Sequence, residues 1–140
     1  SNVKSLDVSS FDTSKVTNMD NMFDRTAITE LKGLNNFNTS NVTSMSNMFI
    51  MSQLTTLDLS SFDTSKVTNM SRMLEKCAKL TTIYVSDKFI TDNVTNSSNM
   101  FKSSTKLVGG SGTKYDSTKI DKTYARIDGG TSSPGYFTRK

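Results

Sequence analysis

The sequence predicts an α/β repeat fold: a right-handed solenoid with parallel strands on one side, short helices on the other, and a β-rich C-terminal cap. Three observations predict it. A unit of about 25 residues recurs four times between residues 3 and 108. Within each unit, alternating apolar residues are followed by apolar residues at helical spacing, the order of a strand and its right-handed crossover helix. After Val108 the composition changes sharply.

The four copies are recognisable by direct reading. Copies one and three read LDVSSFDTSKVTNM and LDLSSFDTSKVTNM, while copies two and four carry small insertions near Gly33 and Lys88. The copies begin at Leu6, Leu31, Leu57 and Ile83. A unit of this size cannot bury its apolar edge alone, so we expect each copy to pack against its neighbours.

Apolar residues align in five columns when the copies are superposed. Seven of the eight methionines and seven of the eight phenylalanines fall in these columns. Methionine columns also raise the alternative of a soft-metal or oxidation-sensing site, but nothing beside them offers a histidine or thiolate ligand, so we interpret them as core. The columns are Phe11, Phe37, Phe62 and Phe89; Val16, Val42, Val67 and Val94; Met19, Met45 and Met70; Met22, Met48, Met73 and Met100; and Phe23, Phe49, Leu74 and Phe101.

Each copy contains two periodicities. Alternation over residues 6–9, 57–60 and 83–86 predicts strands with one buried face. The spacing of Val16, Met19, Met22 and Phe23 predicts one face of a short helix. We expect the residues two positions before the Val column to cap these helices, namely Ser14, Ser40, Ser65 and Asp92. We expect the preceding Thr column to bond to backbone or to stack as a ladder, at Thr13, Thr39, Thr64 and Thr91.

The sequence predicts two parts: four strand–turn–helix repeats over residues 3–108, and a C-terminal cap or tail over residues 109–140. The second part holds six of the seven glycines, the single proline and three of the four tyrosines. A turn is expected at residues 109–112, strand character at 123–128, and a last short strand at 136–138. Its aromatic residues favour a cap over a flexible tail. At the other end, the exposed edge of the first strand could pair with another chain and give an oligomer.

Composition and charge exclude several classes of protein. Of the 140 residues, 34% are hydrophobic and the formal net charge is +4. Residues 1–70 carry 5 basic and 7 acidic groups, and residues 71–140 carry 12 and 6. The lysines are scattered among Ser and Thr rather than forming a basic stripe with aromatics, so we predict no nucleic-acid partner, while weak attraction to acidic surfaces stays open.

Cys77 has no partner for an internal disulfide and is interpreted as a buried filler. No apolar stretch is long enough to span a membrane, and no signal peptide is visible.

Two long units carry a resemblance to a known family. Residues 6–22 and 57–73, with the pattern L-D-x-S-S-F-D-T-S-K-V-T-N-M, resemble the BspA-like leucine-rich repeats of bacterial surface proteins, and residues 115–137 resemble the segment that follows their last repeat. The resemblance implies a leucine-rich-repeat solenoid and a non-enzymatic, extracellular protein of the bacterial cell surface. It implies host or bacterial surface proteins, matrix proteins or glycans as partners, and no cofactor.

Function is therefore predicted to be binding or adhesion, with a passive spacer that displays another domain as the alternative. The absence of His removes Ser–His and Cys–His bases, and the recurring Asp residues have structural reasons to recur, so we predict no catalytic, cofactor or metal site and no enzyme. The outward polar residues of the strands form the candidate ligand face. They are Asp7, Ser9, Thr56, Asp58, Ser60, Thr82, Tyr84 and Ser86. Tyr84 offers the largest contact area among them.

Overall fold

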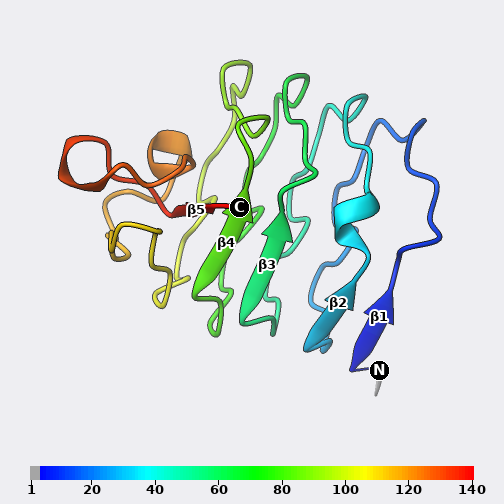
Figure 1. Cartoon of the computed structure of the whole chain (residues 1–140), viewed down its shortest axis with the longest axis horizontal. Helices are drawn as coiled ribbons and strands as arrows, with labels where there is room; N and C mark the ends of the chain where they lie inside the picture. The colour runs from blue at the N-terminus through cyan, green and yellow to red at the C-terminus, as the bar shows by residue number, and fades with distance from the viewer. Residues whose placement is uncertain (1–3) are drawn as a thin grey trace.

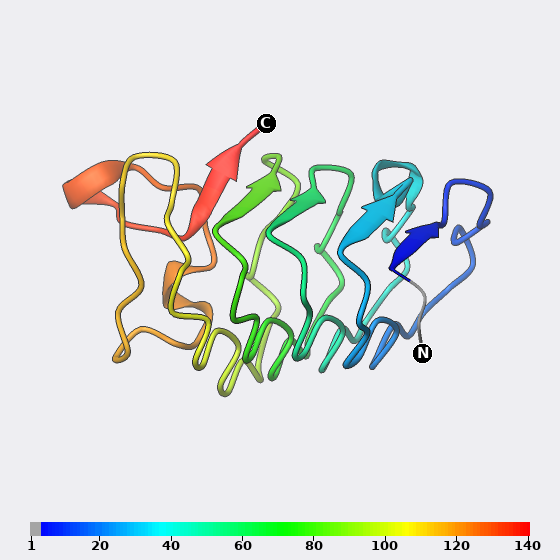
Figure 2. The same cartoon turned by 90° about the horizontal axis from the view of Figure 1, so that it is seen from below.

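The computed structural model describes residues 4–140, and in it the four repeats lie side by side along the long axis of the molecule (Figure 1). The predicted repeat region begins at residue 3, which lies outside the described residues. Seen from below, the N-terminus lies at one end of the row and the segment after residue 108 at the other (Figure 2). The elements are β1 (Ser5–Asp7), β2 (Glu30–Lys32), the 3-10 helix η1 (Leu34–Asn36), β3 (Thr56–Leu59), β4 (Thr82–Val85), η2 (Lys122–Tyr124), η3 (Gly130–Ser132) and β5 (Phe137–Arg139).

The strands form two small parallel sheets instead of one. Strand β1 pairs with β2, and β3 pairs with β4 and β4 with β5. The break lies in copy two, where Gly33 has a φ of 88° and an added Cβ would approach the backbone nitrogen of Ser9 to 2.3 Å. The chain then turns into η1, which places Leu34 in the core where a strand would otherwise continue. The insertion near Gly33 thus lies at the place where the sheet is interrupted between β2 and β3.

The segments predicted to be helical are chains of tight turns. In copy two, Met48 N–H donates to the Met45 carbonyl and Ile50 N–H donates to the Asn47 carbonyl, at 3.3 Å each. Two residues in every repeat have left-handed backbone, which an α-helix cannot contain. They form two columns: Asn21, Asn47, Arg72 and Asn99, with φ from 56° to 60°, and Arg25, Met51, Lys76 and Ser103, with φ from 54° to 66°.

Alternate amide groups of these turns bond to the next repeat rather than within their own. Met45 N–H donates to the Asn69 carbonyl at 2.9 Å, and Phe49 N–H donates to the Met73 carbonyl at 2.9 Å. The same bonds join copy one to copy two and copy three to copy four. In all of these bonds the N–H donor belongs to one repeat and the carbonyl acceptor to the repeat that follows it. We call this row of hydrogen bonds the ladder, and it runs in one direction along the molecule.

The prediction of a right-handed α/β leucine-rich-repeat solenoid is wrong. Residues 4–140 contain no α-helix, and their strands form two small sheets without a continuous sheet along one side, so the chain is almost entirely strand, turn and coil. The physical reason is the pair of left-handed residues per repeat, which converts the helical spacing of Val16, Met19, Met22 and Phe23 into turns that still bury one side.

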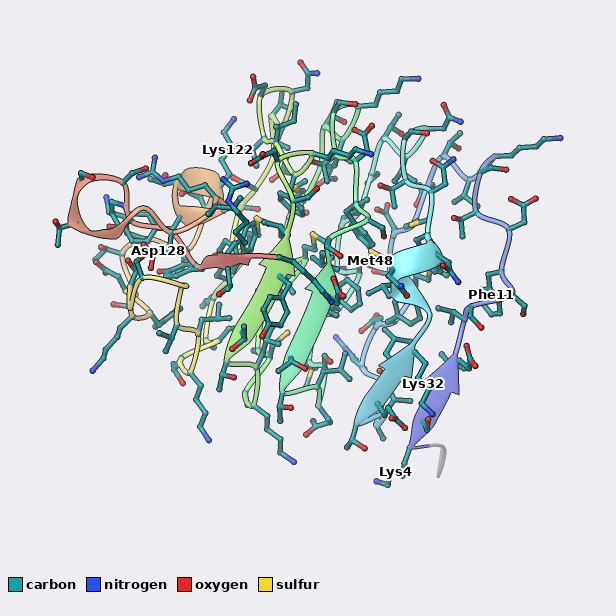
Figure 3. The ribbon with its side chains drawn as sticks, in the orientation of Figure 1. Lys4, Phe11, Lys32, Met48, Lys122 and Asp128 are labelled. Atoms are coloured by element: carbon teal, nitrogen blue, oxygen red, sulfur yellow. The ribbon has the colours of Figure 1, made fainter. Side chains whose placement is uncertain are left out.

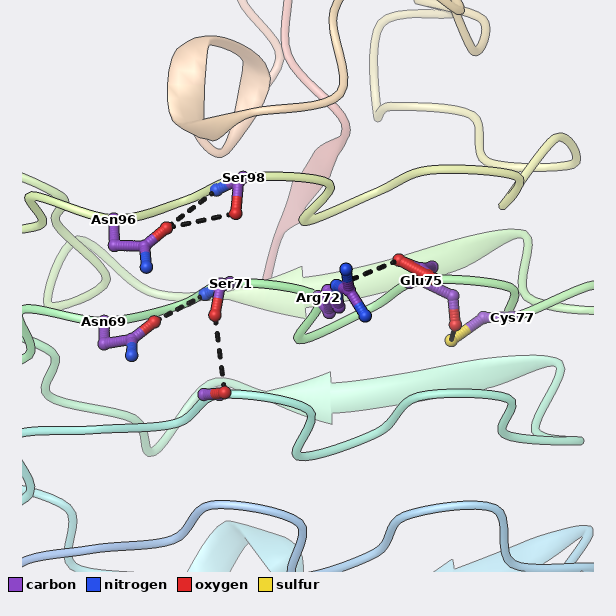
Figure 4. Close-up of polar contacts among 8 residues, drawn as sticks. Asn69, Ser71, Arg72, Glu75, Cys77, Asn96 and Ser98 are labelled. Atoms are coloured by element: carbon purple, nitrogen blue, oxygen red, sulfur yellow. Dashed lines mark hydrogen bonds and ion pairs between the residues drawn. The ribbon is translucent and has the colours of Figure 1, made fainter.

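The predicted helix caps are also wrong, because their hydroxyls and amides serve local turns. Ser14 N–H donates to Asp12 Oδ1 at 3.0 Å, an arrangement in which a short polar side chain mimics a backbone turn. Figure 4 shows a second row of such turns, where Asn69 Oδ1 accepts from Ser71 N–H at 2.9 Å and Asn96 Oδ1 accepts from Ser98 N–H at 3.2 Å. The recurring Asp, Asn and Ser residues thus fix loop shape.

Three members of the Thr column, Thr13, Thr39 and Thr64, bond to backbone, as expected. Thr39 Oγ1 donates to the Asp63 carbonyl at 2.9 Å and accepts the Asp63 N–H at 2.8 Å. Thr13 and Thr64 make the same two bonds to the repeats that follow them. Each of these hydroxyls is buried and satisfies both polar groups of one residue in the next repeat.

The aligned apolar columns form the core. Met45, Met48, Met70 and Met73 are fully buried, and the Phe37 and Phe62 rings stack with centroids 6.4 Å apart. Cys77 is buried, as predicted. Phe11 departs from the prediction: it is 48% exposed, whereas its counterparts Phe37, Phe62 and Phe89 are buried.

The segment after residue 108 closes the C-terminal end of the core. Tyr136 and Phe137 are fully buried, and Phe137 packs edge-on against Phe89 with centroids 4.9 Å apart. The expected turn at residues 109–112 forms, and the last strand appears as β5. The expected strand at 123–128 is wrong, because residues 122–124 form η2.

Two polar side chains fix this segment (Figure 3): Lys122 ties it to the last repeat, and Asp128 ties its own loops together. Lys122 Nζ donates to the carbonyls of Thr91 and Val94, at 3.2 and 2.7 Å. Asp128 accepts hydrogen bonds from Ser111, Thr113 and Gly130 at 2.7 to 3.0 Å. Burial alone would raise the pKa of Asp128, but these bonds outweigh it and hold the pKa at about 2.

Candidate functional site

The predicted ligand face is divided by the break between the sheets. Asp7 and Ser9 lie at the end of β1, in the first sheet. The other predicted residues lie on or just beyond β3 and β4, in the second sheet: Thr56, Asp58, Ser60, Thr82, Tyr84 and Ser86. The structure therefore brings six of the eight together and separates two.

The C-terminal residues occupy part of the second sheet's outer face. Lys140 Nζ lies 2.5 Å from Asp58 Oδ2 and 5.7 Å from the centroid of the Tyr84 ring. Arg139 Nη1 pairs with Asp87 Oδ1 at 2.7 Å. Tyr84, the largest predicted contact residue, is therefore half-buried beneath the chain's own Lys140.

The two aspartates of this predicted face are also held by neighbouring loop residues. Ser9 N–H donates to Asp7 Oδ1 and Ser60 N–H donates to Asp58 Oδ1, at 2.9 Å each. Burial opposes ionisation of Asp58, but the bonds from Lys140 and Ser60 lower its pKa. Hydrogen bonds from Ser9 lower the pKa of Asp7. Both carboxylates thus shape the chain where each strand ends.

A groove of about 330 Å³ lies instead at the edge where the strands begin. Copies one, two and three all contribute residues to it, and Lys4, at this edge in Figure 3, belongs to its wall. The lining combines three cations, three side chains with hydrogen-bonding groups and two apolar side chains. Its residues are Lys4, Arg25, Thr26, Ala27, Thr29, Met51, Gln53 and Lys79.

Backbone bonds between repeats position these residues. Arg25 N–H donates to the Ile50 carbonyl at 2.8 Å, and Met51 N–H donates to the Glu75 carbonyl at 2.9 Å. Thr29 N–H donates to the Lys4 carbonyl at 2.8 Å. The backbone beneath the groove is therefore fixed by hydrogen bonds between repeats.

The charge of this edge is one-sided. We define the strand-start edge as residues 24–29, 50–55, 75–81 and 102–108. It carries five basic residues and two acidic ones. The Glu75 side chain is 9% exposed and that of Asp24 28%, whereas that of Arg25 is 69% exposed. The basic residues are Arg25, Lys76, Lys79, Lys102 and Lys106, and the acidic ones are Asp24 and Glu75.

The edge where the strands end has a different charge. We define the strand-end edge as residues 9–17, 35–43, 60–68 and 86–95, where three basic residues face four acidic ones. The basic residues are Lys15, Lys66 and Lys88, and the acidic ones are Asp12, Asp63, Asp87 and Asp92. The two edges of the same repeats thus differ in electrostatic character.

Comparison with known proteins places the chain in a family. Residues 1–115 match the family model described as "Mycoplasma protein of unknown function, DUF285". The chain belongs to the DUF285 family. No BspA-like or leucine-rich-repeat family matches, so the sequence resemblance to BspA-like repeats is wrong. No curated protein and no solved structure matches the chain.

The Cys77 thiol of this DUF285 chain lies in the core. Burial raises the pKa of the Cys77 thiol to about 11, and its Sγ lies 3.2 Å from the Phe49 carbonyl oxygen. Among residues 4–140, no group of three or more His, Cys, Asp or Glu side chains could hold a metal ion. In the same part of the DUF285 chain, no helix has the length and apolar character needed to cross a membrane.

Sequence reasoning missed the groove, although part of its signal was visible. The basic excess of residues 71–140 is visible in the sequence, but its lysines look scattered because Lys79, Lys102 and Lys106 lie in linkers between the expected elements. Aligning the linkers of this DUF285 chain, as the core columns were aligned, would have placed Arg25 and Lys76 at one position of the repeat. The contribution of Lys4 required the structure.

Proposed function

We propose that this DUF285 chain is a non-catalytic binding module. The observation that carries the proposal is the groove on the strand-start edge, where Lys4, Arg25 and Lys79 converge beside the polar side chains of Thr26, Thr29 and Gln53. Most other conspicuous side chains serve the core or the loops. A pocket with a few convergent polar groups is the ordinary form of a binding site.

The proposal is tested by screening the purified 140-residue chain against immobilised glycans and matrix proteins. We expect saturable binding to at least one class of ligand, lost when the chain is unfolded by urea. Absence of binding across the screen, with the folded state checked by circular dichroism, would contradict the proposal.

A passive spacer is the second candidate, favoured by the near-identity of copies one and three and by the continuous ladder between repeats. In that case Arg25 and Lys79 would serve only solubility. The two candidates differ in one measurable respect, since a spacer shows no saturable ligand.

A location on the outside of the cell is a separate proposal, since the resemblance that suggested it is not supported. Binding to an external glycan or matrix protein would require it. Protease treatment of intact cells that produce the protein naturally tests it. We expect loss of the chain from intact cells, with a cytosolic protein as the resistant control.

A further inference from the structure

We infer that the groove on the strand-start edge binds an acidic polysaccharide, with one sulfated or carboxylated sugar unit seated between Arg25 and Lys79. This inference rests on the proposed binding function and names the class of ligand. It is carried by the charge, the size and the mixed chemistry of the groove.

The charge of the groove selects an anion. Its lining contains three cations, at Lys4, Arg25 and Lys79, and no acidic residue. The neighbouring Asp24 lies 3.4 Å from Arg25 Nε, but the Arg25 side chain is 69% exposed. A guanidinium presents several donors in one plane, which suits the oxygens of a carboxylate or a sulfate.

The remaining lining residues favour an anionic sugar over other anionic ligands. Gln53 offers an amide and Thr29 a hydroxyl, which can bond to sugar hydroxyls, and Met51 is 40% exposed, so it can cover the apolar face of a ring. The Thr26 hydroxyl is buried against the groove and has no hydrogen-bond partner among the described residues. A volume of about 330 Å³ lies at the small end of ligand pockets, which suits a single sugar unit.

The basic residues around the groove favour a polymeric anion over a single small ligand. Lys76, Lys102 and Lys106 continue the basic strand-start edge across copies three and four, and all three are exposed. Lys76 N–H donates to the Lys102 carbonyl at 2.8 Å, so these lysines lie on adjacent repeats. The groove contains no aromatic side chain on which nucleic-acid bases could stack. An acidic polysaccharide fits this combination better than a single-stranded nucleic acid.

The test measures binding of the full 140-residue chain to heparin, polygalacturonate, neutral dextran and single-stranded oligo(dT) by isothermal titration calorimetry. We expect saturable binding to heparin or polygalacturonate. Because heparin carries both carboxylates and sulfates and polygalacturonate carries carboxylates alone, binding to heparin but not to polygalacturonate assigns recognition to sulfate, and binding to polygalacturonate shows that a carboxylate suffices. Dextran should not bind, and oligo(dT) should bind at least about tenfold more weakly. Binding to the acidic polysaccharide should weaken as salt rises.

Matched variants separate the groove from overall charge. Arg25→Gln with Lys79→Gln removes two groove cations, while Lys15→Gln with Lys66→Gln removes two cations from the strand-end edge of the same protein. We expect about a tenfold or greater loss of affinity for the first pair and less than about twofold for the second, because each hydrogen bond to a charged group contributes strongly to binding. Gln53→Ala leaves the charge unchanged, and we expect it to weaken polysaccharide binding several-fold.

Four results would overturn the inference. Equal losses for the two cation pairs would assign the binding to general charge. Equal affinity for oligo(dT) would remove the assignment to sugars. Binding to some other glycan or matrix protein that the groove variants leave unchanged would refute this site but keep the proposed function, whereas absence of any ligand would refute both. Urea midpoints close to that of the wild type show that each variant is folded.

Discussion

The two ends of the row of repeats show what a neighbouring repeat provides. At the N-terminal end, Phe11 is 48% exposed, and no described residue donates to the carbonyls of Asn18 or Asp20, which lie where later repeats accept bonds. At the C-terminal end, Phe89 is 7% exposed beneath Phe137. Phe101 N–H donates to the Ile120 carbonyl at 3.0 Å, so the segment after residue 108 replaces a fifth repeat.

This difference shows that a column in the sequence does not by itself define a core. Phe11 and Phe62 stand in nearly identical sequence surroundings, SSFDTSKVTNM in both, yet one is half exposed and the other fully buried. Burial in this fold is a property of pairs of repeats.

The largest expected effect on stability comes from replacing phenylalanine by alanine at one of two equivalent positions, Phe62 and Phe11. Phe62→Ala should lower the free energy of unfolding by about 3–5 kcal/mol, because it leaves a cavity in the closed core. Phe11→Ala should lower it by less than about 1 kcal/mol, because its ring is already half exposed. Urea denaturation of both variants gives the comparison, and equal losses would contradict the difference between the two positions.

The next effect tests how the C-terminal end is held. Asp128→Asn should cost about 2–3 kcal/mol, because an amide leaves buried N–H donors unpaired. Its folded pKa of about 2 lies below its ordinary value, so the carboxylate's contribution is complete above about pH 4 and disappears as pH falls through 2.

Unfolding free energies measured at pH 6 and pH 2.5 check the prediction for Asp128. The wild-type chain should lose more stability between these values than Asp128→Asn, by about 1–2 kcal/mol. Asp116→Asn is the control, because Asp116 accepts similar bonds from Thr118 but is exposed. If wild type and Asp128→Asn lose the same stability at low pH, the Asp128 carboxylate does not stabilise the C-terminal segment.

The smallest expected effect is a gain in stability, and it should be similar in the first and the last repeat. Arg25→Gly and Ser103→Gly should each raise stability by about 0.5–1 kcal/mol, because glycine adopts left-handed backbone without strain. Lys66→Gly, at a position without left-handed backbone, should lower it by a similar amount. Thermal midpoints measure all three, and destabilisation by both of the first two would restore a helical interpretation of these segments.

The core was predictable from the sequence and the path of the backbone was not. Core residues such as Met45, Met70 and Val67 can be recognised because the same residue type recurs from repeat to repeat. This recurrence is visible in the sequence whatever conformation the backbone adopts. Helical spacing at Val16, Met19, Met22 and Phe23 is equally produced by turns that return to the same side every three or four residues. Asn at positions 21, 47 and 99 hinted at left-handed backbone, but Arg72 and Lys76 gave no such hint.

The candidate site was less accessible to sequence reasoning. The predicted face assumed one continuous sheet, but the sheet is broken between β2 and β3, where the chain turns at Gly33 into η1. The covering of Tyr84 by Lys140 joins residues far apart in the sequence. The groove joins side chains from three repeats, and its position follows from the ladder bonds of Arg25 and Met51.

The spacing between repeats bears on the two candidate functions in terms of length. Bonded backbones lie about 4.8 Å apart, so a unit of about 25 residues lengthens the molecule by only about 5 Å. The same number of residues in an α-helix would reach about 37 Å. Repetition in this chain is therefore an inefficient way to gain reach and an efficient way to widen a surface, since each added unit extends both of its edges.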